Sequence, residues 1–175
     1  MKGEISLRRF KALCKKEVYS LKSKRIVGSL RDILVDNKGH MRYIVVNTGN
    51  IFNGNWIYGI HNVKSFTKNA IEIKDEARRE LRADGDAQSI INILGRMVKS
   101  EDKIVGMVED VHLDLRHRSI IGFEISRGFL MDVCNGMQII LFEDILFKDG
   151  YIVCHSRNGL EVYKGGIKNI INREG

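Results

Sequence analysis

The segment 112–118, HLDLRHR, holds the densest group of side chains that could do chemistry. On a strand, His112, Asp114 and Arg116 would alternate onto one face, followed by two basic residues in a turn. A His/Asp pair on one face could act as a general base or supply half of a metal site. Further ligands are missing from the neighbouring sequence, so we expect a solvated hairpin here.

The rest of the chain lacks the usual signatures of catalysis. There is no Walker-type loop, GxGxxG, HExxH, GxSxG or EF-hand spacing. Cys14, Cys134 and Cys154 are widely spaced, without a CxxC, which disfavours a disulfide framework and a thiolate metal site. We therefore expect no enzyme, no cofactor and no bound metal.

An internal repeat organises the chain. IVGSLRDILVD, residues 26–36, recurs as IVGMVEDVHLD, residues 104–114, at an offset of 78, with five of eleven positions identical. The apolar alternation changes parity in the middle of each copy, which predicts a β-bulge and a bent strand. The signature positions of the repeat are Gly28, Asp32, Asp36, Gly106, Asp110 and Asp114.

These signature residues have structural interpretations. We expect Gly28 and Gly106 to lie where a side chain cannot fit. Asp32 and Asp110, at the parity change, could form a pair of carboxylates, but accepting loose backbone N–H groups at a bulge is the simpler role. Asp36 begins a D-N-K-G tetrad typical of a type I turn.

The pattern predicts an all-β fold of two small tandem barrels, each of about five to six short, strongly bent antiparallel strands. In the first unit we expect a strand within residues 10–21, a turn at 22–25, and later strands at 41–46, 57–60, 63–66 and 70–73. The predicted domains are 1–75, with a basic N-terminal segment, and 89–157. A charged linker, 76–88, lies between them, and a tail, 158–175, follows and would pack on a barrel.

The repeated Ile-x-Gly-x-x-x-Asp pattern, followed by a turn and the strand MRYIVV, resembles the PRC-barrel. This is the small β-barrel shared by the H subunit of bacterial photosynthetic reaction centres and the C-terminal domain of the ribosome maturation factor. The resemblance covers residues 8–75 and 89–157, and it implies two such barrels in tandem.

Charge is concentrated at the beginning of the chain. The formal net charge is +7, and residues 1–25 hold nine basic side chains against Glu4 and Glu17. Such a segment could meet RNA, an anionic membrane surface or an acidic protein face, or be a solvated leader. The residues that we single out for a partner or RNA are Arg8, Arg9, Lys11, Lys15, Lys16, Phe52 and Trp56. The two aromatic residues would stack on bases, or pack between barrels.

Taken together, the sequence predicts a cytoplasmic, non-enzymatic adaptor that binds another macromolecule, with a protein partner expected. An RNA- or ribosome-associated accessory factor is the alternative, and a barrel that binds a small ligand or metal is a weaker one. No apolar run approaches the roughly 18 residues of a membrane span, and we read no signal peptide.

Overall fold

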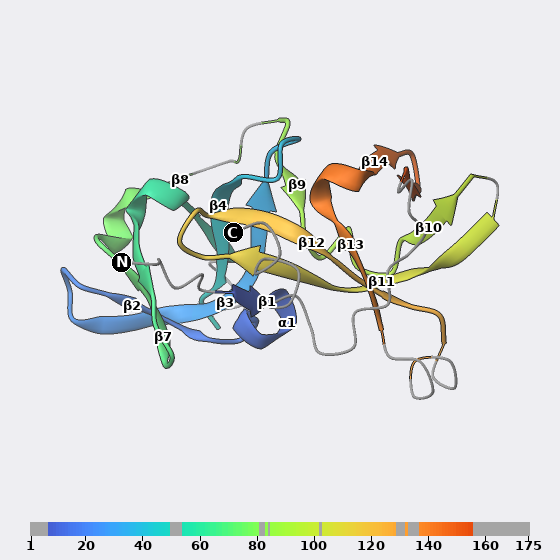
Figure 1. Ribbon diagram of the computed structural model, residues 1–175. Coiled ribbons are helices and arrows are strands. Elements are labelled where there is room, and N and C mark those ends of the chain that lie inside the picture. Colours follow the sequence, from blue (N-terminus) through green and yellow to red (C-terminus); the bar gives the residue numbers. More distant parts are fainter. Residues whose placement is uncertain are drawn as a thin grey trace, which may run out of the picture. The chain divides into compact units, whose positions relative to one another are not determined.

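The computed structural model describes residues 7–49, 54–80, 83, 85–101, 103–128, 132 and 137–155 (Figure 1). The fold is all-β, and it divides into two compact units. The first unit comprises residues 1–91 and 114–119, and the second comprises residues 92–113 and 120–175. The predicted fold class of two small barrels is confirmed.

Short strands and single helical turns build the first unit. Its elements are β1 (Leu7–Arg9), α1 (Phe10–Leu13), β2 (Glu17–Ser20), β3 (Arg25–Val35), β4 (Met41–Asn47), β5 (Asn55–Gly59), η1 (Ile60–Asn62), β6 (Val63–Phe66), β7 (Ala70–Ile73), η2 (Glu76–Arg78), β8 (Arg79–Glu80) and β9 (Gln88–Ser89). The strand order is β6-β7-β2-β3-β4-β5-β8, and β9 pairs with β3.

The second unit repeats this order. Its elements are β10 (Met97–Ser100), β11 (Lys103–Asp114), β12 (Ser119–Ser126), β13 (Gln138–Leu141), η3 (Phe142–Asp144), β14 (Ile145–Lys148) and β15 (Tyr151–Cys154). The order β14-β15-β10-β11-β12-β13 matches β6-β7-β2-β3-β4-β5, and η3 follows β13 as η1 follows β5. The repeat seen in 11 residues therefore extends through a whole barrel.

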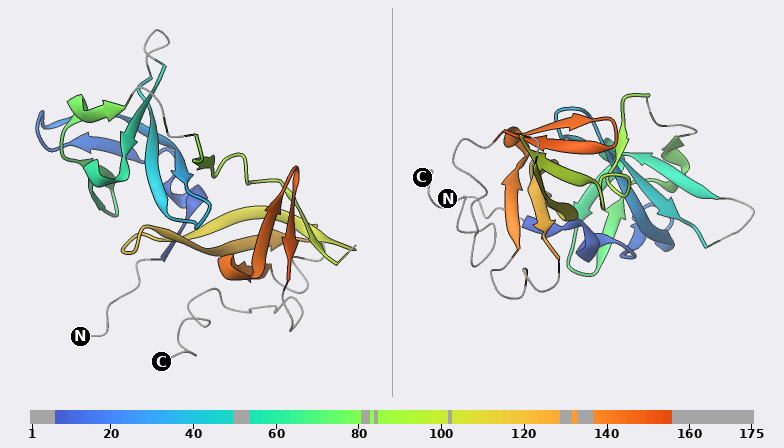
Figure 2. Two further views of the ribbon diagram at one scale, coloured as in Figure 1. Left: turned by 90° about the horizontal axis from the view of Figure 1, so that it is seen from above. Right: turned by 90° about the vertical axis from the view of Figure 1, so that its right-hand side faces the viewer.

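The direction of two strand pairs differs from the prediction. Antiparallel strands were expected throughout, but β2 pairs with β7 in parallel, and β10 pairs with β15 in parallel. After its hairpin with β6 or β14, the strand β7 or β15 returns to lie beside β2 or β10 in the same direction. The bulge is where the parity change predicted it, because the register of β3 on β4 shifts between Leu30 and Asp32. The bent strands of each barrel are visible in Figure 2.

The N-terminal segment contains a helical turn that the sequence pattern did not predict. Residues 10–13 form α1, which buries Phe10 and Leu13, three residues apart on one side of the turn. A short strand, β1, precedes α1, and the expected strand begins only at Glu17. Residues 21–24 turn as predicted.

The predicted linker contributes to the first unit. β8 pairs with β5, and β9 pairs with β3 at Leu34 and Val35. Ile90 donates its N–H to the carbonyl of Ile33. The domain boundaries themselves stay a prediction, and the tail 158–175 lies outside the described residues.

Candidate functional site

Gly28 and Gly106 allow two strands to approach closely. A Cβ on Gly28 would lie 2.3 Å from the carbonyl oxygen of Asn47, and one on Gly106 would lie 2.5 Å from that of Ser126. Both glycines have φ +156°, a value that other residues rarely adopt. The two copies thus use glycine for the same close contact with the neighbouring strand, β4 or β12.

Asp32 anchors the segment that follows β9. The carboxylate of Asp32 accepts the backbone N–H of Ile33 at 2.8 Å and that of Ile91 at 3.2 Å, and the hydroxyl of Ser89 donates to its other oxygen. Burial raises the pKa of this carboxyl, and the hydrogen bonds oppose the rise only in part. A residue 59 positions further on, Ile91, is therefore held by the bulge.

Asp110 takes the corresponding place in the second unit. It is fully buried and accepts the N–H of Val111 at 2.8 Å, as Asp32 accepts that of Ile33. Each of the two carboxylates accepts the backbone N–H of the residue that follows it in the same strand. This is the structural role weighed for them from the sequence.

Asp36 and Asp114 each close a turn. Asp36 Oδ1 accepts the N–H groups of Lys38 and His40, and its carbonyl accepts that of Gly39 at 3.0 Å. Asp114 Oδ1 accepts the N–H groups of Arg116 and His117, and its Oδ2 lies 2.7 Å from His117 Nδ1.

The two turns differ in their environment. Asp114 is 3% exposed, whereas Asp36 is only half-buried. Burial alone would raise the pKa of Asp114. The hydrogen bonds from the His117 side chain and from the backbone outweigh that effect and lower the pKa.

Arg118 ties the turn 114–119 into the first unit. Its guanidinium donates to the carbonyls of Ile60 and Val63, both at 2.9 Å. Its own carbonyl accepts the N–H of Met41 at 2.7 Å. Arg118 has φ +55°, in the left-handed region. Residues 114–119 therefore belong to the first unit, although they connect two strands of the second.

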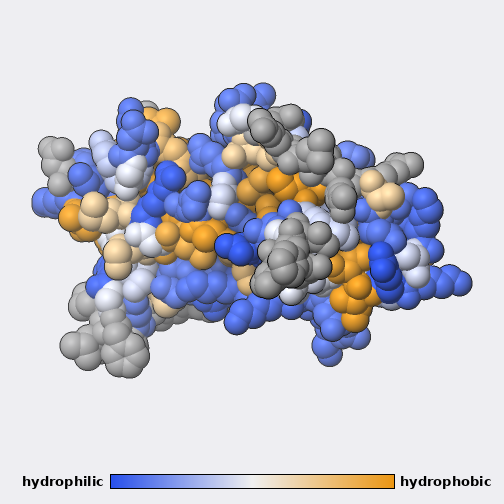
Figure 3. All heavy atoms as spheres, turned by 180° about the vertical axis from the view of Figure 1, so that it is seen from behind, coloured by the Kyte–Doolittle hydropathy of each residue, from blue (hydrophilic) through white to orange (hydrophobic). Residues whose placement is uncertain are grey.

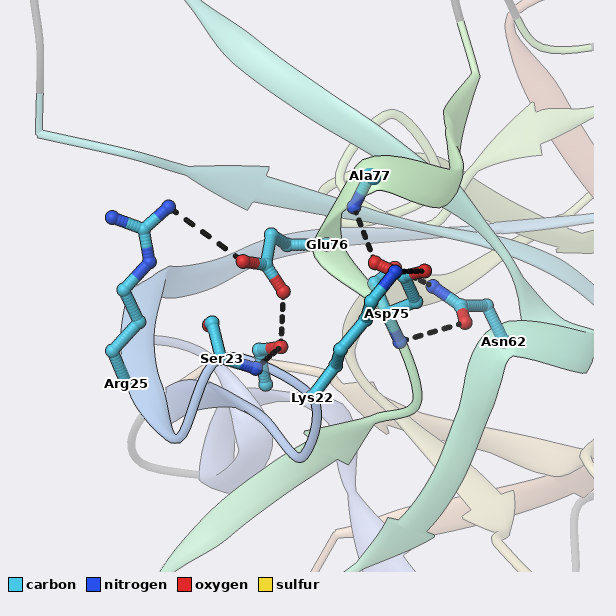
Figure 4. Close-up of polar contacts among 8 residues, drawn as sticks. Lys22, Ser23, Arg25, Asn62, Asp75, Glu76 and Ala77 are labelled. Carbon is cyan, nitrogen blue, oxygen red and sulfur yellow. Dashed lines mark hydrogen bonds and ion pairs between the residues drawn. The ribbon is translucent and has the colours of Figure 1, made fainter.

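A polar cluster joins the end of the first repeat to its beginning (Figure 4). Lys22 and Asp75 form an ion pair at 2.8 Å, and Asp75 also exchanges backbone hydrogen bonds with the side chain of Asn62. Ser20 donates to Glu76, and this hydrogen bond is the main reason why the pKa of Glu76 is lowered. The cluster fixes residues 75–77 against the β2–β3 turn.

His112 lies beside a residue that the sequence did not pair with it. Its Nε2 is 3.4 Å from Glu124 Oε2 on β12, without hydrogen-bond geometry, and both residues are 9% exposed. Unit 1 has Leu34 and Val45 at the equivalent positions. Among the described residues, no three His, Cys, Asp or Glu side chains are placed to hold a metal ion.

A cavity of about 290 Å³ lies in the first unit. Asp36 lies at its wall with His40 and Arg42, at 3.6 Å and 3.9 Å from their nitrogens. The lining residues are Asp36, His40, Met41, Arg42, Tyr43, Gly59, Ile60 and His61. Its charged groups already pair with one another, and this leaves a ligand little to bind.

The basic residues singled out from the sequence lie at the surface. Arg8, Arg9, Lys11 and Lys15 are exposed, whereas Lys16 donates to the carbonyl of Lys68. The aromatic platform stays a prediction. Trp56 packs edge to face against buried Tyr58, with ring centroids 6.5 Å apart, and Phe52 lies outside the described residues.

The second unit exposes an apolar sheet face. Four large side chains on β10, β11 and β14 are exposed: Met97 (41%), Ile104 (63%), Met107 (52%) and Leu146 (45%). The strand registers place them on one side of the sheet, because Met97 pairs with both Met107 and Tyr151, Lys99 pairs with both Ile104 and Val153, and Leu146 pairs with Val153. The same registers place two cations on this side, Lys99 between Ile104 and Val153, and Lys148 beside Tyr151. We call the six apolar members, Met97, Ile104, Met107, Leu146, Tyr151 and Val153, the apolar face.

The first unit provides an internal comparison for this face. Its equivalent strands pair in the same way, except for a register shift between Val63 and Ser65 in β6 that β14 lacks, and each position of the apolar face has a counterpart. Glu17, Ser29, Ser65, Ala70 and Glu72 stand where the second unit has Met97, Met107, Leu146, Tyr151 and Val153, and only Ile26 matches Ile104. The same barrel therefore forms with polar residues at four of these six positions, and its fold does not require apolar side chains there.

On the side of the molecule shown in Figure 3, hydrophobic residues are exposed among hydrophilic ones. Sequence reasoning missed the apolar face, because its members are spread over residues 97–153 and alternate with buried residues. Comparing the two aligned repeats position by position would have revealed it.

The fold defines a class of small, bent β-barrels that occurs here in tandem. The family model described as the PRC-barrel domain matches residues 7–77, so the first unit contains a PRC-barrel domain. The second unit repeats the strand order of the matched one. No curated protein is similar to the chain. None of the helices among the described residues is long and apolar enough to cross a membrane.

Proposed function

We propose that this protein is a non-enzymatic, cytoplasmic adaptor that binds another protein through the surface of its second barrel. The observation that supports the proposal is the apolar face. Soluble proteins rarely expose a contiguous apolar patch unless it binds something. The first barrel carries polar residues at four of the six equivalent positions, so the apolar side chains at those four are not needed for folding.

The composition of the face suits protein binding. Two of its six members are methionines, whose flexible thioether side chains adapt to different partner surfaces. Tyr151 adds a rigid aromatic ring of the kind enriched at interfaces, and the amine of Lys99 lies 4.4 Å from the centre of that ring. The face is therefore apolar and adaptable, with one cation held against its aromatic ring.

Affinity capture from the native cells tests the proposal. The bait is the full chain, as wild type, as a face variant (Met97→Glu, Met107→Ser, Leu146→Ser) and as a control (Ile26→Ser). The face variant carries the residues of the first barrel, which folds with them. We expect a protein that wild type and control retain and the face variant loses, with at least about a tenfold loss of affinity once that protein is purified. Equal retention by the face variant would refute the adaptor role of this surface.

An RNA- or ribosome-associated accessory function is the second candidate. The supporting observation is the exposure of Arg8, Arg9, Lys11 and Lys15 near the N-terminus. Because phosphate contacts make RNA binding depend strongly on salt, a titration separates this candidate from the adaptor. That measurement is described in the Discussion.

A further inference from the structure

The sheets of the two barrels differ at one edge. In the first unit, β5 lies between β4 and β8, so both sides of β5 are paired. In the second unit, β13 corresponds to β5 and pairs with β12, and no strand of the described residues pairs with its other side (Figure 1). An unpaired edge leaves a row of backbone N–H and C=O groups without ladder partners.

The sequence of β13 does not protect this edge against pairing. Natural edge strands commonly carry a lysine, a proline or a bulge that discourages the addition of another strand. β13 has the sequence QIIL, without a charge or a proline, and its register on β12 has no shift. The edge is therefore suited to accept a further strand.

The close contact at Gly122 shows which backbone groups of β13 point towards the unpaired side. A Cβ on Gly122 of β12 would lie 2.4 Å from the carbonyl oxygen of Ile140, so this carbonyl faces β12. Successive residues of an antiparallel ladder direct their backbone groups to alternate sides. The N–H and C=O of Ile139 therefore face away from β12, where a further strand would meet them.

The first barrel shows which part of the chain covers the corresponding edge. Lys74 follows β7 and donates its N–H to the carbonyl of Asn62, and the chain then passes through η2 into β8. In the second barrel, His155 follows β15 and donates its N–H to the carbonyl of Asp144 at 2.8 Å. Residues 156–175 thus begin at the same point of the barrel as the segment that leads to β8.

The sequence after His155 contains a counterpart of β8. Counting on from the two bonded residues, β8 (Arg79–Glu80) corresponds to Leu160 and Glu161. The segment 160–163 reads LEVY, in which Val and Tyr favour strands, and the chain contains no proline. Its composition is that of a short strand.

From these observations we propose that residues 160–163 pair with β13 as an antiparallel edge strand. The register is that of β8 on β5 in the first barrel, and it puts Glu161 opposite Ile139 and Leu160 opposite Ile140. Release of this strand would open the edge to an extended segment of another protein, a mode of recognition called β-augmentation. The inference concerns a surface other than the apolar face and goes beyond the adaptor function.

Nuclear magnetic resonance of the full wild-type chain tests the pairing directly. In the proposed register Glu161 and Ile139 exchange hydrogen bonds, so Leu160 and Ile140 form a close pair without them, with Cα atoms about 4.5 Å apart. We expect a nuclear Overhauser contact between the Hα atoms of Leu160 and Ile140, and slow hydrogen exchange at the amide of Ile139. Absence of the contact, or free exchange at Ile139, overturns the inference.

A pair of proline variants tests the same hydrogen bonds in the full chain. Glu161→Pro removes the N–H that the carbonyl of Ile139 would accept, so exchange at the amide of Ile139 should become at least about tenfold faster. Lys168→Pro, in the same tail but beyond the pairing segment, is the control and should exchange as the wild type. The amide of Ile140, which faces β12, should stay protected in both variants, as a readout of the folded barrel.

Wild-type exchange at Ile139 in Glu161→Pro would show that the tail does not cover the edge. Dilution separates the tail from a second copy as the occupant. Pairing within one chain does not depend on concentration, so protection of Ile139 should be constant between about 10 and about 300 μM. Protection that is lost on dilution would mean that another chain supplies the strand, and it overturns the inference.

Discussion

At the residue scale, one amino acid type is required at one position of each barrel. Gly28 and Gly106 have the same φ, and both face a carbonyl oxygen of the neighbouring strand at a distance that no side chain permits. Relief would require the two strands to separate, because the clashing atom is backbone. A flexible neighbouring side chain could move aside, but a strand carbonyl cannot do so without loss of ladder hydrogen bonds.

Replacement of either glycine by alanine should therefore be costly. We expect Gly28→Ala and Gly106→Ala each to lower the free energy of unfolding by more than about 1 kcal/mol, the scale of overpacking and backbone strain. Gly85→Ala is the matched control, because nothing lies within 4 Å of its added Cβ. Urea unfolding measures the three variants, and a normal midpoint for Gly28→Ala and Gly106→Ala would remove the role assigned to them.

Two aspartates of the signature have opposite electrostatic effects. The folded state raises the pKa of Asp32, mainly by burial, and it lowers that of Asp114, whose hydrogen bonds with His117 and the backbone outweigh its burial. Asp32 thus contributes stability below its unfolded pKa of about 3.9, which is lost as the pH rises through its folded pKa. The contribution of Asp114 is present above about pH 3.9 and is lost as the pH falls through its folded pKa.

Replacing Asp32 or Asp114 by asparagine should change the pH dependence of stability in opposite directions. With rising pH above about 3.9, the stability of Asp32→Asn should improve relative to the wild type, because asparagine cannot become charged. Below about pH 3.9, the stability of Asp114→Asn should approach that of the wild type as the pH falls. Denaturant unfolding across this range gives both difference curves, and slopes of the same sign would contradict the assignment.

At the element scale, the hairpin of β11 and β12 supplies the first unit with its turn, residues 114–119. Arg118 makes this possible, because its planar guanidinium reaches two carbonyls, those of Ile60 and Val63, at once. Val63 is the first residue of β6 and pairs with Ile73, and the carbonyl of Ile60 also accepts the backbone N–H of Val63. The turn therefore adds a side-chain donor to two carbonyls at the start of β6.

Loss of this side chain should destabilise the first barrel. We expect Arg118→Ala to cost about 1–3 kcal/mol, since two carbonyls each lose the hydrogen bond from the guanidinium, and Arg118→Lys to recover only part because lysine lacks the fork. Arg116→Ala, in the same turn but exposed, serves as the control. Hydrogen exchange at residues 60–66 gives the local readout, and unchanged protection in Arg118→Ala would show that the contact is not needed.

At the scale of the whole molecule, the two barrels share a strand order but differ in chemistry. The densest group of basic residues lies in residues 1–25, whereas the second barrel carries four of the seven exposed large hydrophobic residues among those that the structure describes. A duplicated fold can keep one copy polar while the other acquires a binding face. The adaptor and the RNA hypotheses accordingly concern different ends of the chain.

A salt titration with RNA tests the basic segment. We expect no tight binding at physiological salt. If the segment did bind single-stranded RNA, each phosphate contact would contribute about 0.7 to the slope of log affinity against log salt. Sub-micromolar filter binding that is lost on changing Arg8, Arg9, Lys11 and Lys15 to Gln would favour the accessory factor. Binding must then persist in the control, which has Gln at Lys38, Lys64, Lys68 and Lys103, four exposed lysines elsewhere.

The repeat, the all-β fold, the bulge beside Asp32 and the turn at Asp36 could be read from the sequence. These features are local, because period-two alternation, a change of parity and an Asp-to-Gly tetrad each lie within a few neighbouring residues. Because the segment is duplicated, the same sequence patterns occur twice and support the same prediction independently. It also placed Gly28 and Gly106 at equivalent positions before their contacts were known.

The helical turn α1, the parallel pairings, the link from Asp32 to Ile91 and the apolar face emerged only in three dimensions. All but α1, a turn of four consecutive residues, depend on residues far apart in the chain. Met97, Met107, Leu146 and Tyr151 come from four strands, and each strand taken alone shows only alternation of one exposed and one buried side chain. Strand order and register decide which exposed residues become neighbours, and long-range pairing sets both.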